Sequence, residues 1–189
     1  MPLPSSLDRA GNGFASVVRL VRDDQWALPT PCDGWTVRAL VGHVTAGSRM
    51  ATALASGGTR NDAITLLSVD HLGDDPLASV EAALAAQLEA FSHDDIATHV
   101  FPHPAGDMPG AQVLRFRILD LLVHRWDLAR AIGVDETLDA ELVHEVWEGM
   151  SPIIPMMAAS GVFGSGPSGD VTDDAPVQTR LLDAVGRRP

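Results

Sequence analysis

Residues 117–133 read R-I-L-D-L-L-V-H-R-W-D-L-A-R-A-I-G, and this stretch decides the fold. It is the end of a helix that we expect from about residue 111 to Ile132, closed by Gly133 as its C-terminal cap. Asp120 and His124 lie four residues apart, so a helix places them on one face with Cβ atoms roughly 5–6 Å apart. A carboxylate in such apolar surroundings is costly unless it is paired or bound to a metal ion.

Apolar residues recur at steps of three and four along three further stretches, which is the period of an amphipathic helix. These helices are expected over residues 6–24, over residues 36–55 with Thr36 as N-cap, and from Pro76, with an inward face of Leu77, Val80, Leu84, Leu88 and Phe91. Residues 57–75 are expected to form a loop with a short helical turn at 64–67. Residues 97–110 hold three prolines and two glycines, so we expect them to be irregular or to form a short hairpin around 99–109.

The four long helices favour an all-α fold, a four-helix bundle. A fifth helical segment is expected over residues 137–159, broken or kinked by its prolines. Residues 160–175 are rich in Gly, Ser, Pro and Asp and are expected to be a linker. A tail helix over residues 176–186, capped by Asp174, follows, and its apolar stripe is expected to pack on the bundle. We expect one domain over residues 1–189, with the bundle at about 6–159.

The composition excludes several classes of protein. The 189 residues carry a net charge of −12, and all 13 basic residues are arginines. An acidic chain without a basic run argues against nucleic acid and against an anionic membrane surface as partners. No apolar run reaches the roughly 18 residues of a membrane span, and no signal peptide is recognisable, so we expect a cytoplasmic protein. The single cysteine, Cys32, excludes internal disulfides and cysteine-cluster metal sites.

A metal site is one interpretation of the polar residues in the two longest helices. His43 lies beside the apolar stripe of the second helix and would join Asp120 and His124 as a third ligand. Three N/O ligands leave a position open, as in catalytic metal sites. Such a set suits zinc, and also nickel, iron or manganese. Asp127 lies one turn after His124 and would orient a ligand, or else form an ion pair with a neighbouring arginine.

The simpler alternatives stay open at this point. Asp120 and His124 would then only hydrogen-bond each other, and His43 would be an ordinary core histidine. Cys32 precedes the second helix, where a helix N-terminus lowers a thiol pKa, but a lone free cysteine is more often inert packing.

Three stretches resemble one known family: T-P-C-D-G-W-T-V-R-A-L-V-G-H-V at 30–44, D-L-L-V-H-R-W-D-L-A-R-A-I-G at 120–133, and D-D-A-P-V-Q-T-R-L-L-D-A-V-G-R-R-P at 173–189. They are similar to the mycothiol-dependent maleylpyruvate isomerase-like metal-binding proteins of the DinB-like superfamily, the last stretch to a short single-domain subgroup. The resemblance implies a DinB-like four-helix bundle with a short C-terminal helix. It also implies one divalent metal ion held by His43, Asp120 and His124, and a mycothiol-type thiol as cosubstrate.

The isomerase differs in having Glu where this chain has Asp120, and in carrying a further C-terminal domain after the bundle. We therefore expect a thiol-dependent transferase or isomerase that acts on a small electrophile, with conjugation favoured over maleylpyruvate isomerisation. The alternatives are a non-catalytic metal- or ligand-binding bundle and a plain helical interaction domain. A homodimer is an open alternative to a monomer.

Overall fold

The computed structural model describes residues 2–93, 95–159 and 166–189. The chain divides into two compact units, Met1–Val134 and Asp135–Pro189. The expectation of one domain over residues 1–189 stays a prediction.

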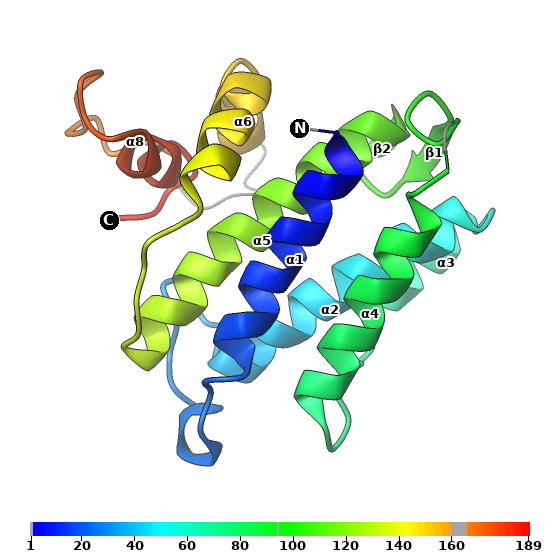
Figure 1. Cartoon of the computed structure of the whole chain (residues 1–189), viewed down its shortest axis with the longest axis horizontal. Helices are drawn as coiled ribbons and strands as arrows, with labels where there is room; N and C mark the ends of the chain where they lie inside the picture. The colour runs from blue at the N-terminus through cyan, green and yellow to red at the C-terminus, as the bar shows by residue number, and fades with distance from the viewer. Residues whose placement is uncertain (1, 94, 160–165) are drawn as a thin grey trace. The chain divides into compact units, whose positions relative to one another are not determined.

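The first unit is a four-helix bundle. Its helices are α1 (Leu3–Val18), α2 (Val37–Ala55), α4 (Pro76–Ala90) and α5 (Gly110–Ile132). Helices α4 and α5 each lie against both α1 and α2, so every helix contacts two neighbours (Figure 1). The predicted all-α class is confirmed.

Helix α5 is buried on nearly all its sides. Leu119, Leu121, Val123 and Leu128 are each 0% exposed, although they point in different directions around the helix. A helix that is covered on nearly all its sides is a buried helix, unlike one with a stripe that faces solvent. Each large apolar side chain buried in this way contributes about 1.5–3 kcal/mol to stability. This burial carries Asp120 and His124 into the interior of the bundle.

The helix boundaries agree with sequence signals at several ends. Thr36 accepts a hydrogen bond from the Ala39 amide at the start of α2, and Asp75 accepts one from the Ala78 amide at the start of α4. Gly133 closes α5 in the left-handed conformation, with φ of 74°. These contacts satisfy backbone groups that a helix end leaves without partners.

The first helix is shorter than expected. It ends at Val18, and the chain then forms a 3-10 turn, η1 (Asp23–Gln25). Leu20 is 55% exposed, so the apolar period stops there. The turn places the Gln25 amide against the end of α5, where Nε2 donates to the Ile132 carbonyl at 3.1 Å. The residues that were expected to extend α1 therefore form a 3-10 turn instead, and its Gln25 caps a carbonyl at the end of α5.

The connections contain more structure than the sequence indicated. Helix α3 (Arg60–Leu67) is longer than the predicted turn, because Thr59 and Asp62 form a capping box at its start. The expected hairpin is present as antiparallel strands β1 (Val100–His103) and β2 (Gly106–Pro109).

The inward face of α4 was predicted only in part. Val80 and Phe91 are buried, but Leu77, Leu84 and Leu88 are only half-buried. Ala83 and Gln87 take the inward positions instead. Gln87 belongs there because it has a buried hydrogen-bond partner, Arg117, which no hydrophobic pattern reveals.

The second unit contains α6 (Ala140–Met150), α7 (Ile154–Ala159) and α8 (Val177–Ala184). The break between α6 and α7 confirms the predicted interruption near the prolines. Helix α8 contacts α6 and α7, and it buries Leu181, Leu182 and Val185. The expected cap at Asp174 is wrong: Asp174 accepts a hydrogen bond from Thr172, and the residue before α8 is Pro176. Of the expected linker, residues 160–165 lie outside the described residues.

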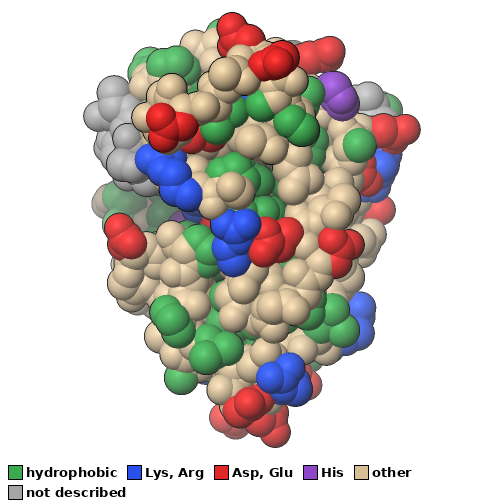
Figure 2. All heavy atoms as spheres, turned by 90° about the vertical axis from the view of Figure 1, so that its left-hand side faces the viewer, with side chains coloured by type: hydrophobic (Ala, Val, Ile, Leu, Met, Phe, Trp, Pro, Cys, Tyr) green, Lys and Arg blue, Asp and Glu red, His purple; other side chains and the backbone are tan. Residues whose placement is uncertain are grey.

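Within the described part of the chain, no helix is both long and apolar enough to cross a bilayer. Figure 2 shows acidic, basic and apolar side chains interspersed on the face in view, without a continuous basic patch among the residues drawn there in colour. This distribution agrees with the acidic net charge.

Candidate metal centre

His43 of α2 and the Asp120–His124 pair of α5 meet inside the bundle. Oδ1 of Asp120 lies 3.3 Å from Nε2 of His43 and 3.3 Å from Nε2 of His124. All three atoms lie within 4.8 Å of one another. His124 is buried, whereas the His43 side chain is 36% exposed. The structure therefore brings together the three residues that the sequence singled out, with one of them reachable from outside.

The other oxygen of Asp120 is taken by a residue that the sequence analysis missed. Arg117 is 5% exposed, and its Nη1 donates to Asp120 Oδ2 at 2.7 Å. Its remaining nitrogens donate to Gln87 Oε1, to the Val44 carbonyl and to Ser48 Oγ. An arginine with this many partners is fixed in position, and it holds the carboxylate so that Oδ1 faces the two histidines.

Gly47 makes room for this arginine. A Cβ atom at Gly47 would lie 2.3 Å from Nη1 of Arg117, which is closer than any real contact. The sequence shows Arg117 three residues before Asp120, a spacing that allows an ion pair on one helix face. The buried pair could not be recognised there, because the glycine that admits the guanidinium is on another helix.

Asp127 orients His124 from the other side. Its Oδ2 lies 2.9 Å from Nδ1 of His124 and is 3.3 Å from Sγ of Cys32, whose thiol donates to it. An acceptor at Nδ1 fixes the proton on that nitrogen and leaves Nε2 directed at Asp120. Cys32, which the sequence suggested to be inert packing, thus lies beside the candidate metal centre, with Sγ 3.9 Å from His124 Nδ1.

The electrostatics of the cluster follow from these contacts. Burial opposes the charged form of Asp120, but the guanidinium of Arg117 and the two histidines outweigh it and hold the pKa of that carboxyl well below its ordinary value. Burial likewise opposes a charged His124, but the Asp120 carboxylate, with the hydrogen bonds to Asp120 and Asp127, raises the pKa of His124 well above its ordinary value. The centre thus attracts a positive charge, whether a proton or a cation.

The donor set and its spacing fit a divalent metal ion. Two donor atoms held at about 2.1 Å from one tetrahedral ion lie roughly 3.4 Å apart. The two N–O separations in this cluster are 3.3 Å, longer than the roughly 2.7–2.9 Å of a charge-assisted hydrogen bond. Among the described residues, the group consists of two imidazoles and one carboxylate.

A cavity of about 500 Å³ lies next to His43. Small or apolar side chains of α2, with Trp35, form one wall, and residues 67–70 form the other. The Trp35 ring covers the two histidines, with ring centroids 4.7 Å from His43 and 5.9 Å from His124. Arg38, Thr36 and Ser68 add polar groups to the lining. Trp126, by contrast, is 1% exposed and belongs to the core.

The first unit is thus a four-helix bundle that carries a His–Asp–His cluster, of which His43 lines a cavity. Over residues 7–129, the sequence matches the family model described as the mycothiol maleylpyruvate isomerase N-terminal domain, and the chain belongs to this family. Two uncharacterized proteins of Mycobacterium tuberculosis strains are each 34% identical over 137 residues, which is 72% of this chain and 71% of each relative.

Two solved structures share the fold. The crystal structure of the mycothiol-dependent maleylpyruvate isomerase has a TM-score of 0.55 at 19% identity, and that of a histidine-to-alanine variant has 0.58 at 18%. Each comparison covers 91% of this chain and 74% of the isomerase chain. The DinB-like four-helix bundle expected from the sequence is therefore confirmed.

Proposed function

We propose that His43, Asp120 and His124 hold one divalent metal ion, with zinc as the first candidate, and that the protein uses it in a mycothiol-type, thiol-dependent transfer or isomerisation on a small electrophile. The observation that carries the proposal is the position of Asp120 Oδ1, 3.3 Å from the ring nitrogen of each histidine. Family membership supports the thiol, because the isomerase of known structure is described as mycothiol-dependent.

The protein's own residues prepare this centre in three ways. Arg117 neutralises Asp120 Oδ2 and directs Oδ1 inward, and Asp127 fixes the ring of His124. Trp35 covers the imidazoles and limits the access of water from its side. A divalent ion in such a place acts as a Lewis acid and favours the thiolate form of a bound thiol, the form that adds to electrophilic carbon.

The cavity beside His43 supports a catalytic centre over a closed structural one. A structural zinc site has four protein ligands, whereas the group here, as far as the described residues go, supplies three. The cavity offers about 500 Å³ with both apolar walls and polar groups, which suits a polar thiol. Arg38 at its rim is held by Asp70 Oδ2 at 3.1 Å and by the Gly73 carbonyl at 3.2 Å.

The test combines metal analysis with a thiol-conjugation screen. We expect the metal-loaded protein to accelerate the reaction of a mycothiol-type thiol with a panel of electrophiles, and His43→Ala to abolish the gain while circular dichroism stays helical. His99→Ala is the matched control, because His99 lies outside the cluster. A faster reaction with the metal-free protein would contradict the proposal.

The same experiment separates the alternatives. Turnover of maleylpyruvate without any transferase activity would reverse the preference for conjugation. Stoichiometric metal without acceleration, and without thiol binding, would indicate the non-catalytic metal-binding bundle.

A further inference from the structure

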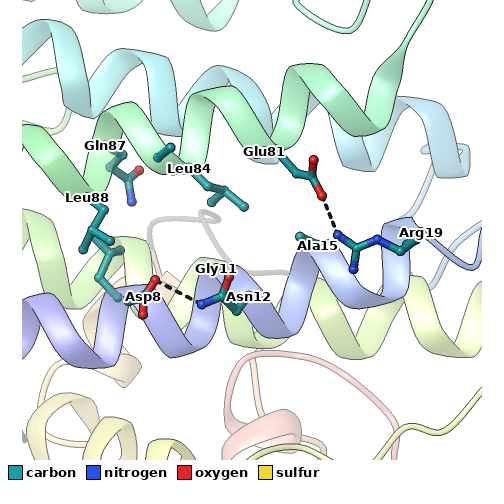
Figure 3. A pocket seen from close by; sticks show the side chains of 11 residues that line it. Asp8, Gly11, Asn12, Ala15, Arg19, Glu81, Leu84, Gln87 and Leu88 are labelled. Carbon is teal, nitrogen blue, oxygen red and sulfur yellow. Dashed lines mark hydrogen bonds and ion pairs between the residues drawn. The ribbon is translucent and has the colours of Figure 1, made fainter.

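The groove between α1 and α4 has a volume of about 390 Å³, but the charged side chains labelled in Figure 3 are engaged with partners. Arg19 forms an ion pair with Glu81, and Asn12 Nδ2 donates to Asp8 Oδ1 at 3.0 Å. These pairs serve one another and call for no ligand. A different group of side chains, beside His124, has the composition of a metal site.

Cys32, His124 and Asp127 form this group, and it differs from the His–Asp–His cluster in the nitrogen that it uses. Cys32 Sγ lies 3.3 Å from Asp127 Oδ2 and 3.9 Å from His124 Nδ1, and Oδ2 lies 2.9 Å from that nitrogen. The His–Asp–His cluster uses Nε2 of His124 instead. The two sets of donor atoms thus lie on different sides of one imidazole ring. We call the three residues the Cys–His–Asp group.

The spacing of these donor atoms is close to that around one metal ion. An ion held at about 2.3 Å by sulfur and at about 2.1 Å by nitrogen or oxygen sets the sulfur roughly 3.6 Å from the other two donors. The two sulfur distances in the group lie on either side of this value. The thiol and the Nδ1 N–H both donate to Asp127 Oδ2. A divalent ion replaces these two protons, which pass to the solvent buffer, and the N–O pair opens slightly to admit it.

The loop before α2 holds Cys32 in place over the ring. The Cys32 amide donates to Thr30 Oγ1 at 3.2 Å, and its carbonyl accepts from the Trp35 amide at 3.0 Å. The Thr30 amide closes the loop by donating to the Trp35 carbonyl at 3.0 Å. Asp127 and His124 are 0% and 4% exposed, whereas Cys32 is half-buried. A cation therefore reaches the group from the side of Cys32, and the ligands are positioned before it arrives.

We propose that the Cys–His–Asp group binds a soft, thiophilic divalent cation, with Sγ, Nδ1 and Oδ2 as protein ligands and water completing the set. The sulfur decides the class of cation, because thiolates select soft metal ions over hard ones such as Mg²⁺. A neutral imidazole has one lone pair, so a cation at Nδ1 leaves the His124 proton on Nε2. A cation here takes His124 away from the proposed metal centre, but the site itself needs neither His43 nor Asp120.

The test is a titration of the full, metal-free chain with Cd²⁺, followed through the ultraviolet charge-transfer band of a cadmium–thiolate bond. Cys32 is the single cysteine of the chain, so the band reports its thiolate alone. We expect the band to saturate at one ion per chain, and an excess of Mg²⁺ to leave it unchanged. The absence of a saturable band would overturn the proposal.

Nuclear magnetic resonance of the natural sequence identifies the nitrogen ligand without any substitution. With ¹¹³Cd and ¹⁵N-labelled protein, we expect a scalar coupling between the cadmium nucleus and Nδ1 of His124. A coupling to Nε2 instead would place the ion in the His–Asp–His cluster and overturn the assignment. This measurement also decides the matter if a variant at His124 does not fold.

Variants separate a three-ligand site from a thiol that binds cadmium alone. Asp127→Asn and His124→Ala should each weaken cadmium binding by about tenfold or more. Asp33→Asn is the matched control, because this exposed carboxylate is next to Cys32 and outside the group. It should leave the affinity unchanged.

His43→Ala removes a ligand of the proposed metal centre and should keep the band, so this site and the proposed function fail separately. Equal cadmium affinity in Asp127→Asn, His124→Ala and the natural protein would show that the thiol binds cadmium by itself. A loss in Asp33→Asn would assign the carboxylate ligand to the loop surface, and a loss in His43→Ala would place the ion in the other cluster. Each of these results overturns the proposal.

Discussion

Arg117 binds one carboxylate oxygen of Asp120, Oδ2, at 2.7 Å, and leaves the other facing His43 and His124. The arginine thus balances the charge of the buried carboxylate without using the oxygen that would bind a metal ion. Removing one partner of a buried ion pair is strongly destabilising, because it leaves a charge without compensation. The fold of the bundle interior and the shape of the candidate centre therefore depend on the same contact.

His124→Ala should remove the metal ion, because His124 contributes the buried imidazole of the cluster. The metal-to-protein ratio of the purified, folded variant, measured by elemental analysis, checks this. His144→Ala, at an exposed position of α6, should keep the ratio of the natural protein. Full stoichiometric metal in His124→Ala would show that the ligands are assigned wrongly.

Asp120→Asn should weaken metal binding more than Asp127→Asn. The first change replaces a charged ligand, whereas the second removes an orienting hydrogen bond, which typically lowers metal affinity about 10–100-fold. Competition with a chromophoric chelator measures both affinities. An equal loss in the two variants, or the reverse order, would mean that the roles of the two carboxylates are exchanged.

Gly47→Ala should destabilise the metal-free protein by about 1–3 kcal/mol, because the added methyl group meets Arg117 and displaces it from Asp120. Gly13→Ala is the matched control in α1. A Cβ atom there meets nothing within 4 Å, so the change should stabilise the helix by about 0.5–1 kcal/mol. Thermal unfolding of both variants gives the comparison, and an unchanged melting temperature for Gly47→Ala would argue against a fixed Arg117.

Stabilisation by zinc should grow as the pH rises. The raised pKa of His124 means that its charged form stabilises the metal-free protein below about pH 6.5, and that this contribution is lost as the pH rises through the raised pKa. The lowered pKa of Asp120 keeps its own contribution above about pH 3.8, until the pH falls through the lowered value. Because zinc must displace the His124 proton, the affinity of the protein for zinc should rise by about tenfold per pH unit below the raised pKa of His124.

Melting temperatures with and without zinc, measured between about pH 6 and 9, follow this effect. Asp127→Asn removes one of the hydrogen bonds that raise the pKa of His124, so in that variant the rise should level off at lower pH. If the rise in melting temperature caused by zinc does not change with pH, zinc does not displace a proton from His124.

Truncation after Ser160 should lower the melting temperature and leave the metal content intact. Helix α8 buries Leu181, Leu182 and Val185 and contacts α6 and α7, so its loss exposes their apolar surface. The milder change Leu181→Ala should cost about 2–5 kcal/mol. An unchanged melting temperature after truncation would mean that α8 adds nothing to stability.

The sequence by itself determined the long helices and the pairing of Asp120 with His124, which lie within a single helix. The period of the apolar residues, Thr36, Pro76 and Gly133 defined the long helices to within a few residues, except at the end of α1. Asp120 and His124 had to share a face, because a spacing of four residues fixes their relation through helix geometry alone.

Only the tertiary structure decided which residues of different helices meet. His43 joins Asp120, and Arg117 fits against Gly47, through the rotation and offset of α2 relative to α5. Cys32 reaches Asp127 across 95 positions of sequence, and Gln87 reaches Arg117 across 30. No local pattern encodes these contacts, because they depend on how the packed side chains of several helices set the distances between them.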